Sequence, residues 1–305
     1  MPVDEASYRA WQGSARATHW VVFAIAGTMI GRLMKGRLVR YVTWIGPLGA
    51  CFISAVVFGL LREGKASFPL ARALQRTGMS IDDLLPDLLT LLNLQFQRSI
   101  AFWAVLLAAL VGGPLISEDR RAHALPLYFS RPISHFDYVF GKFLAFAFFL
   151  GLLLLAPPIC MYFIDVGFSD ADGALLDRLP ILLRSLVPSL VRIAVLGAIA
   201  LGISSLARRT NYAALLILGI MMVVGIMAEL LARQIFQDPT WRAVSPNACV
   251  SRIAAQFLPV PDTLPQGRGF VAGMDLGAAW LGAGLWTAAG LAVLLARIRK
   301  VEVVT

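Results

Sequence analysis

The sequence predicts an all-α polytopic membrane protein with six transmembrane helices and an N-terminal amphipathic segment at the membrane interface. Hydrophobic residues make up 58% of the 305 residues and charged residues 15%, whereas soluble domains carry about 25% charged residues. The mean hydropathy is +0.75. Much of the apolar content lies in runs of about twenty residues, the length at which a helix crosses about 30 Å of hydrocarbon. These observations place the chain in a membrane.

Six apolar runs reach, or nearly reach, the length of a membrane span. The second is the shortest, and the fourth and fifth each contain one ionisable residue, Arg192 and Glu229. A further apolar stretch over 20–31 is too short to cross and suits an interfacial helix. The predicted spans, which together form a single transmembrane domain over 41–296, are 41–61, 99–116, 143–164, 186–206, 211–231 and 276–296.

Basic residues predict that both termini are cytoplasmic. On that arrangement the inner segments hold 15 Lys and Arg in 79 residues, against 11 in 102 residues outside. Lys and Arg near span ends concentrate on the cytoplasmic side. We therefore expect a multi-pass protein of the cell (inner or plasma) membrane, with a cytoplasmic N-terminal segment 1–40 and tail 297–305. The net charge of +9 suits anionic membrane lipids, and no basic–aromatic stripe indicates nucleic-acid binding.

The sequence carries no motif of a catalytic, metal or cofactor site. The Gly-Lys pairs at 64–65 and 141–142 are followed by Ala66 and Phe143. A P-loop needs Ser or Thr there to hold magnesium, so the chain is not expected to bind ATP or to be an enzyme by itself. The three cysteines and three histidines lack the spacing of a metal site or a disulfide framework.

Three features lie in, or close to, the segments predicted to be on the outer side of the membrane. Residues 80–97 alternate apolar and polar positions as an amphipathic helix, with Asn93 and Gln97 on the polar face. This helix could lie on the outer interface, pack on neighbouring helices or, less readily, line a ligand site. In the long loop 232–275, residues 248–258 predict a short amphipathic helix, and Pro157-Pro158 predicts a kink near the outer end of the third span.

The cytoplasmic loop 117–142 is the most informative segment. A charged helical turn is expected to extend the second span until Leu125-Pro126, and Ser134 with Asp137 forms a capping box that begins the third. Exposed apolar residues beside paired charges suit a protein-docking surface; a loop that contacts lipid through its basic residues is the alternative. The candidate residues are Ser117, Glu118, Asp119, Arg120, Arg121, Leu127, Tyr128, Phe129, Arg131, Pro132 and Lys142.

Arg192 and Glu229 are the ionisable residues that fall inside predicted spans. Such residues are costly in a membrane and usually find a partner. Their depths differ by about four residues, or about 6 Å along a helix, so an ion pair between the fourth and fifth spans is predicted. A substrate site is the alternative, and Glu229 could also sit among lipid headgroups.

The loop resembles that of ABC-2-type transporter permeases. The resemblance rests on Ile116-Ser117-Glu118-Asp119-Arg120-Arg121, on Leu125 and Leu127, on Ser130-Arg131-Pro132-Ile133-Ser134, and on Gly141-Lys142. Where the family usually has Gly-Thr, this chain has His123-Ala124. The plan of six spans behind a basic amphipathic segment, with a long loop before the last span, is also similar to that family.

The resemblance implies the fold of ABC-2 (type V) exporters and a permease subunit energised by ATP. ATP and magnesium would bind in a separate ATP-binding subunit, and the loop would act as a coupling helix seated in it. The permease would pair with a second copy or a homologue. A membrane-embedded enzyme and a non-transporting anchor or assembly subunit are the alternatives.

Overall fold

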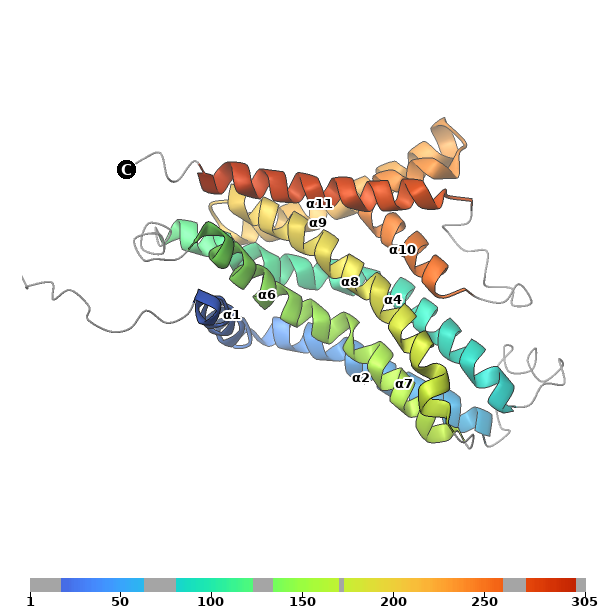
Figure 1. Ribbon diagram of the computed structural model, residues 1–305. Helices are drawn as coiled ribbons and strands as arrows, with labels where there is room; N and C mark the ends of the chain where they lie inside the picture. Colours follow the sequence, from blue (N-terminus) through green and yellow to red (C-terminus); the bar gives the residue numbers. More distant parts are fainter. Residues whose placement is uncertain (1–17, 63–80, 123–133, 170–172, 260–272, 300–305) are drawn as a thin grey trace, which may run out of the picture.

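In the computed structural model, residues 18–62, 81–122, 134–169, 173–259 and 273–299 are described, and their regular structure is helical (Figure 1). The helices α1, α2, α4 and α6 cover Thr18–Leu33, Arg37–Arg62, Ile81–Arg121 and His135–Leu154. They are followed by α7 (Ala156–Phe168), α8 (Ala174–Leu206), α9 (Thr210–Leu230), the π-helix η1 (Leu231–Ile235), the 3-10 helix η2 (Pro239–Val244), α10 (Pro246–Phe257) and α11 (Leu276–Arg299).

Five helical stretches are long and apolar enough to cross a membrane. They are Leu89–Arg121, His135–Gly167, Leu175–Leu206, Thr210–Ile235 and Leu276–Arg297, and they contain the second to sixth predicted spans. Most extend beyond the predicted bounds because the helical hydrogen bonds continue through polar residues next to the apolar run. The predicted first span, 41–61, lies within α2, but several α2 side chains fall outside the described residues, and its crossing stays a prediction.

The centre of the bundle is formed by α4, α6 and α8. Leu107 and Val111 on α4 and Phe146 and Phe149 on α6 are fully buried. A Cβ added to Gly112 would lie 2.6 Å from the Ala200 Cβ of α8, so the α4 and α8 backbones approach closely. The two helices run in the same direction, because residue 97 meets residue 189 and residue 116 meets residue 204.

The packing of α8 on α11 depends on small residues. A Cβ added to Gly202 would lie 2.7 Å from the Gly290 carbonyl oxygen. In lipid, where apolar surface gives little driving force for helix association, close packing of this kind supplies the attraction. In Figure 1 the two helices converge toward the end of the bundle where both finish.

The third span breaks at a pair of prolines. α6 ends at Leu154 and α7 begins at Ala156, with prolines at its first positions. Pro157 and Pro158 have no N–H, so the carbonyls of Leu153 and Leu154 lose their helical donors. The Ser189 hydroxyl donates to the Leu154 carbonyl at 3.0 Å. The predicted kink is therefore confirmed, and a polar side chain of α8 satisfies one of the freed carbonyls.

The predicted amphipathic segment 80–97 forms the start of α4 and runs unbroken into the span. Two residues of its polar face, Asn93 and Gln97, are buried, each 1% exposed. Gln97 donates to Ser189 on α8 at 2.6 Å. The segment thus packs on a neighbouring helix, since α8 offers polar partners on the facing side.

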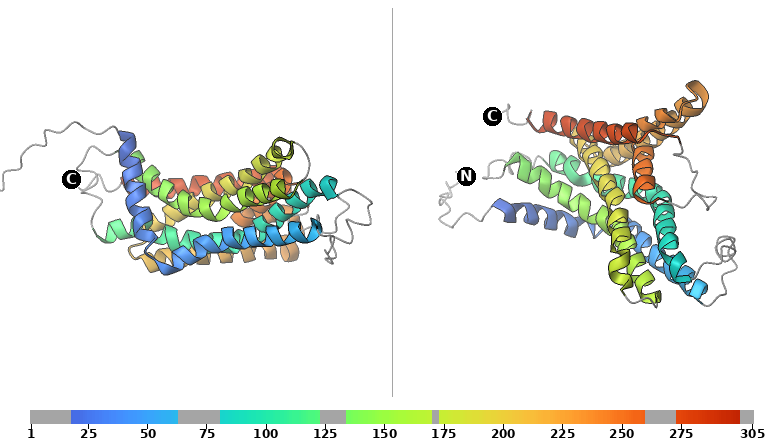
Figure 2. Two further views of the ribbon diagram at one scale, coloured as in Figure 1. Left: turned by 90° about the horizontal axis from the view of Figure 1, so that it is seen from below. Right: turned by 45° about the vertical axis from the view of Figure 1, so that its right-hand side comes forward.

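The helix α1 lies crosswise to the long helices, as the left view of Figure 2 shows. Its buried residues Val22, Ile25, Ala26 and Met29 follow helical spacing. A Cβ on Gly141 would lie 3.0 Å from the Ile25 side chain and 3.1 Å from the Val22 carbonyl oxygen. Glycine at 141 therefore allows α1 to pack against the start of α6.

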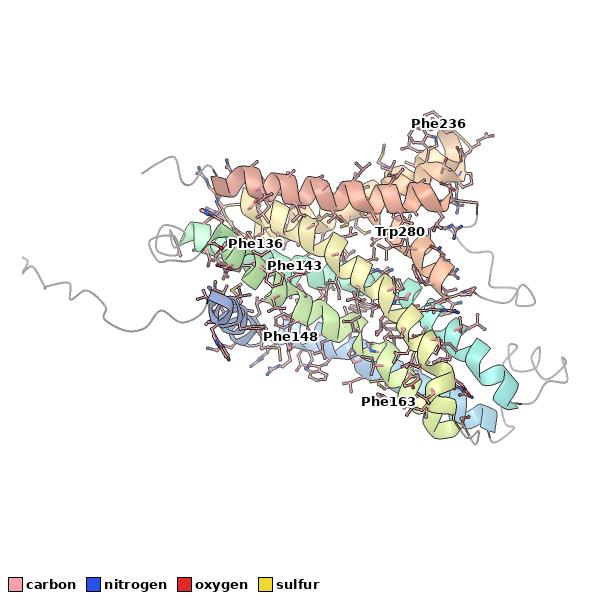
Figure 3. All side chains as sticks on the ribbon, in the orientation of Figure 1. Phe136, Phe143, Phe148, Phe163, Phe236 and Trp280 are labelled. Carbon is pink, nitrogen blue, oxygen red and sulfur yellow. The ribbon has the colours of Figure 1, made fainter. Side chains whose placement is uncertain are left out.

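The two ends of the bundle carry different structures. At one end, termed the loop end, α4 and α11 finish, α6 begins and α1 packs (Figure 1). At the far end, η1 and η2 project with Phe236 at their tip (Figure 3). The Phe236 and Trp241 rings stack with centroids 4.3 Å apart. The predicted helix 248–258 is confirmed as α10, capped by the Ser245 side chain.

Candidate functional site

The loop end holds the described part of the predicted docking loop. The predicted charged turn is confirmed, because α4 continues to Arg121, and so is the capping box, in which the Ser134 hydroxyl accepts from the Asp137 N–H. The third helix accordingly begins at His135, earlier than the predicted span at 143. Five candidate residues lie outside the described residues: Leu127, Tyr128, Phe129, Arg131 and Pro132.

Asp119 joins the two ends of the loop. Its Oδ2 accepts a hydrogen bond from the Tyr138 hydroxyl at 2.7 Å and lies 2.7 Å from the Lys142 Nζ. The Lys142 side chain is 1% exposed and that of Asp119 is 9% exposed. Tyr138 and Lys142 lie four residues apart on one face of α6, and the ammonium stands 5.4 Å from the ring centroid. A buried ion pair thus fastens the end of α4 to the start of α6.

Ser204 fastens the end of α4 to α8. Its hydroxyl accepts from the backbone N–H groups of Ile116 and Ser117, at 3.0 and 3.1 Å, and donates to the Gly113 carbonyl at 2.9 Å. The Ser117 hydroxyl also donates to the Gly113 carbonyl. Gly113 lacks a side chain where α9 approaches, since a Cβ there would lie 3.1 Å from the Thr210 carbonyl oxygen.

The two adjacent arginines face different surroundings. The Arg120 guanidinium donates to the Ser205 carbonyl at the end of α8. Arg121 is exposed. Arg120 therefore reinforces the contact between α4 and α8, whereas Arg121 is available to lipid or to a partner protein.

Glu118 has a partner within the chain. The Arg32 guanidinium of α1 lies 2.8 Å from its carboxylate, and the two side chains are 59% and 27% exposed. This ion pair gives the Glu118 carboxylate a basic partner within the chain, so its presence does not require a docking partner. Glu118 also links α1 to the same turn of α4 that carries Asp119.

Arg192 and Glu229 are not brought together, so the predicted ion pair is wrong. Glu229 pairs with Arg233 one turn further along the chain and with the Arg242 Nε at 3.1 Å. Arg192 contacts α4 instead, where its Nη1 donates to the Gln97 carbonyl at 2.8 Å and to the Gln97 Oε1 at 3.2 Å. The similar depth of Arg192 and Glu229 in the membrane did not predict their partners, because each residue has a nearer partner on another element.

The sequence reasoning missed several residues of these networks. Tyr138 had a usable signal, since it precedes Lys142 by one helical turn. Arg32 had none, because only the position of α1 brings it to Glu118. A buried pair of the far end was also missed: the Arg178 Nη1 lies 2.6 Å from the Asp165 Oδ2, with both side chains at most 6% exposed. Both residues lie between the predicted third and fourth spans, 143–164 and 186–206.

Asp119, Glu118 and Ser204, together with the residues that they contact, form a network at the loop end that we term the frame. Within the described ranges, no group of three His, Cys, Asp or Glu side chains is placed to hold a metal ion. The contacts of Asp119, Glu118 and Ser204 instead connect the segment before residue 123 to α1, α6 and α8. A displacement of the loop would therefore be passed to three helices at once.

The family comparison agrees with this architecture. A family model described as ABC-2 family transporter protein matches residues 79–246, just over half of the chain. That range covers the loop, the contacts of Asp119 and Ser204, and the spans from α4 to α9, whereas α1 with Arg32 lies before it. No curated protein matches the chain. The matched range together with the helical, membrane-spanning fold shows that the chain is a membrane permease belonging to the ABC-2 family of transporter proteins.

Proposed function

We propose that this chain is the permease subunit of an ATP-driven exporter and that its loop 117–142 seats in a separate ATP-binding subunit. ATP and magnesium bind in that subunit, so the permease itself is not an enzyme. The observation that carries the proposal is the frame around Asp119, because it joins both ends of the loop to the helices that must move.

The proposed arrangement in the membrane has six spans, including α2, and both termini in the cytoplasm. α1 lies along the inner interface, where its exposed Trp20 and Phe23 contact lipid. The basic residues near the loop end, including Arg121, support this orientation. A second copy or a homologue completes the transport path, and α9, much of whose surface is exposed within one chain, offers apolar surface to lipid or to that copy.

A photo-crosslinking amino acid placed at Phe129 tests the docking in native membranes. The expected product is a crosslink to a protein that contains a P-loop peptide, identified by mass spectrometry. The same amino acid at Phe236, at the opposite end of the bundle, is the matched control and should give no such product. Crosslinks from Phe129 to lipid alone would refute the docking.

A charge exchange separates docking by Glu118 from its contact with Arg32. Glu118→Lys alone should reduce transport-coupled ATP hydrolysis. If Glu118 acts only through Arg32, the double variant Arg32→Glu/Glu118→Lys restores the pair and the activity. If Glu118 contacts the ATP-binding subunit, the double variant stays uncoupled. Lys35→Gln, an exposed cationic position after α1, controls for a general loss of charge.

A further inference from the structure

A polar stripe lies between α4 and α8 within the apolar bundle. Asn93 and Gln97 on α4 are one helical turn apart, and Ser185, Ser189 and Arg192 follow one face of α8. All five side chains are at most 1% exposed. Arg192 lies 14 residues from the end of α8 at Leu206, or about 21 Å along the helix. It is thus in the half of an about 30 Å hydrocarbon layer that is remote from the loop end.

One edge of the Arg192 guanidinium is held by the protein. Nη1 donates to the backbone and side-chain oxygens of Gln97. The Gln97 amide in turn donates to the Ser189 hydroxyl, and that hydroxyl donates to the Leu154 carbonyl. This chain of hydrogen bonds fixes the orientation of Arg192 from three helices, so Gln97 and Ser189 are positioning residues.

The other edge of the guanidinium has no partner among the described residues. Nε and Nη2 are both buried without a hydrogen-bond acceptor, and no carboxylate of the described residues pairs with Arg192. These two nitrogens form the side of the guanidinium whose parallel N–H bonds match two oxygens of a carboxylate or phosphate. A guanidinium keeps its charge in proteins, and a buried charge requires compensation.

We infer that Arg192 is the anchor of a binding site for the phosphate or carboxylate of an amphiphilic molecule, held by its Nε and Nη2. An amphiphile is required because the group lies within the apolar bundle, where the ligand must enter with its apolar part in contact with the helices. The Asn93 Oδ1, also buried without a donor, lies one turn before Gln97 and offers an acceptor to a protonated oxygen or hydroxyl of the same ligand. Entry requires α4 and α8 to separate, because Arg192 is covered in this structure.

This inference deepens the proposed function by naming the class of cargo or bound lipid, and it can fail separately from it. The test needs no ATP-binding subunit: the affinity of the purified chain in zwitterionic detergent is measured for dioctanoyl phosphatidic acid. Dioctanoyl phosphatidylcholine is the matched amphiphile without net charge. We expect the phosphatidic acid to bind at least tenfold more tightly than the phosphatidylcholine.

Three variants make the test specific. Arg192→Gln should abolish the preference for phosphatidic acid. Arg192→Lys keeps the charge but not the paired N–H groups, and it should lower that affinity at least fivefold even if Arg192→Gln fails to fold. Arg184→Gln removes an exposed charge from the same helix and should leave the affinity within twofold of the unmodified chain.

Defined results would overturn the inference. These are equal binding of the two lipids, equal losses in the Arg192 and Arg184 variants, or full affinity in Arg192→Lys. Displacement of the lipid by millimolar inorganic phosphate would overturn the amphiphilic identity of the ligand. Failure of this binding while the loop still crosslinks to the ATP-binding subunit would leave the proposed function standing.

Discussion

The ion pair of Asp119 and Lys142 should be the most costly contact of the loop end to disrupt singly. Both side chains are nearly inaccessible, so removing either one leaves the other charge buried. Loss of one member of a buried pair costs about 3–5 kcal/mol, whereas replacing both members by neutral residues of similar size is often close to neutral. The Tyr138 hydroxyl bonds the same carboxylate oxygen, which partly compensates the Lys142 variant.

The perturbation is therefore a double-mutant cycle with Asp119→Asn and Lys142→Met. Lys142→Met should lower the free energy of unfolding by about 3 kcal/mol, and Asp119→Asn by at least as much, because the buried ammonium then loses the carboxylate in direct contact with it. The double variant should lose less than the sum by about 2 kcal/mol or more, a coupling expected for residues in contact. The assay is unfolding by sodium dodecyl sulfate in mixed micelles.

The more exposed pair of Arg32 and Glu118 gives the internal comparison. Exposed pairs contribute about 0–1 kcal/mol, and the Arg32 side chain is 59% exposed. Arg32→Gln should therefore cost less than 1 kcal/mol in the same assay. Additive single effects at Asp119 and Lys142, or a cost there as small as that of Arg32→Gln, would refute the reasoning from burial.

Three further outcomes follow from the packing. Gly202→Ala should lower the free energy of unfolding by about 1–3 kcal/mol, because the added methyl group overlaps the Gly290 carbonyl oxygen. Gly219→Ala is the control, since a Cβ there has no atom within 4 Å, and it should not lower this free energy. Equal effects of the two substitutions in the same unfolding assay would contradict the close packing of α8 on α11. Ser189→Ala should lower the free energy of unfolding by about 1–3 kcal/mol, since it leaves the Leu154 carbonyl and the Gln97 amide without a partner. An unchanged free energy of unfolding would argue against these two hydrogen bonds. Burial raises the pKa of the Cys249 thiol to about 11, so its thiol form persists below that pH and maleimide should label it at pH 8 only after unfolding. Rapid labelling of the folded chain would show that α11, which packs on the Cys249 sulfur at Gly282, does not cover it.

The sequence was a good guide wherever a local pattern determines the structure. Apolar runs predicted the second to sixth helical spans, the proline pair predicted the break at Leu155, and Ser134 with Asp137 predicted the start of α6. Each rests on residues close together in the chain. The loop 117–142 was singled out in the same way, from charge and proline spacing.

The sequence was a poor guide to the partners of buried polar residues. Arg192 was paired with Glu229 because the two lie at similar depth, but depth does not specify which faces of two helices meet. The choice of Gln97 follows from the parallel register of α4 and α8, which depends on small residues such as Gly112. Likewise, the amphipathic pattern of 80–97 left open whether the helix lies on the outer interface or packs on a neighbouring helix, because the pattern does not specify that α8 presents Ser189 to Gln97.

The break between α6 and α7 makes one direction of motion inexpensive. Because the prolines have already removed the N–H donors that would bind the carbonyls of Leu153 and Leu154, tilting α6 against α7 disrupts fewer helical hydrogen bonds here than in an unbroken helix. The Leu155 backbone still bonds to Gly151 and Ile159 across the break, and the bond from Ser189 contributes about 1 kcal/mol more. The helix α6, which carries Lys142, can therefore tilt, while α7 stays attached to α8 through the ion pair of Asp165 and Arg178.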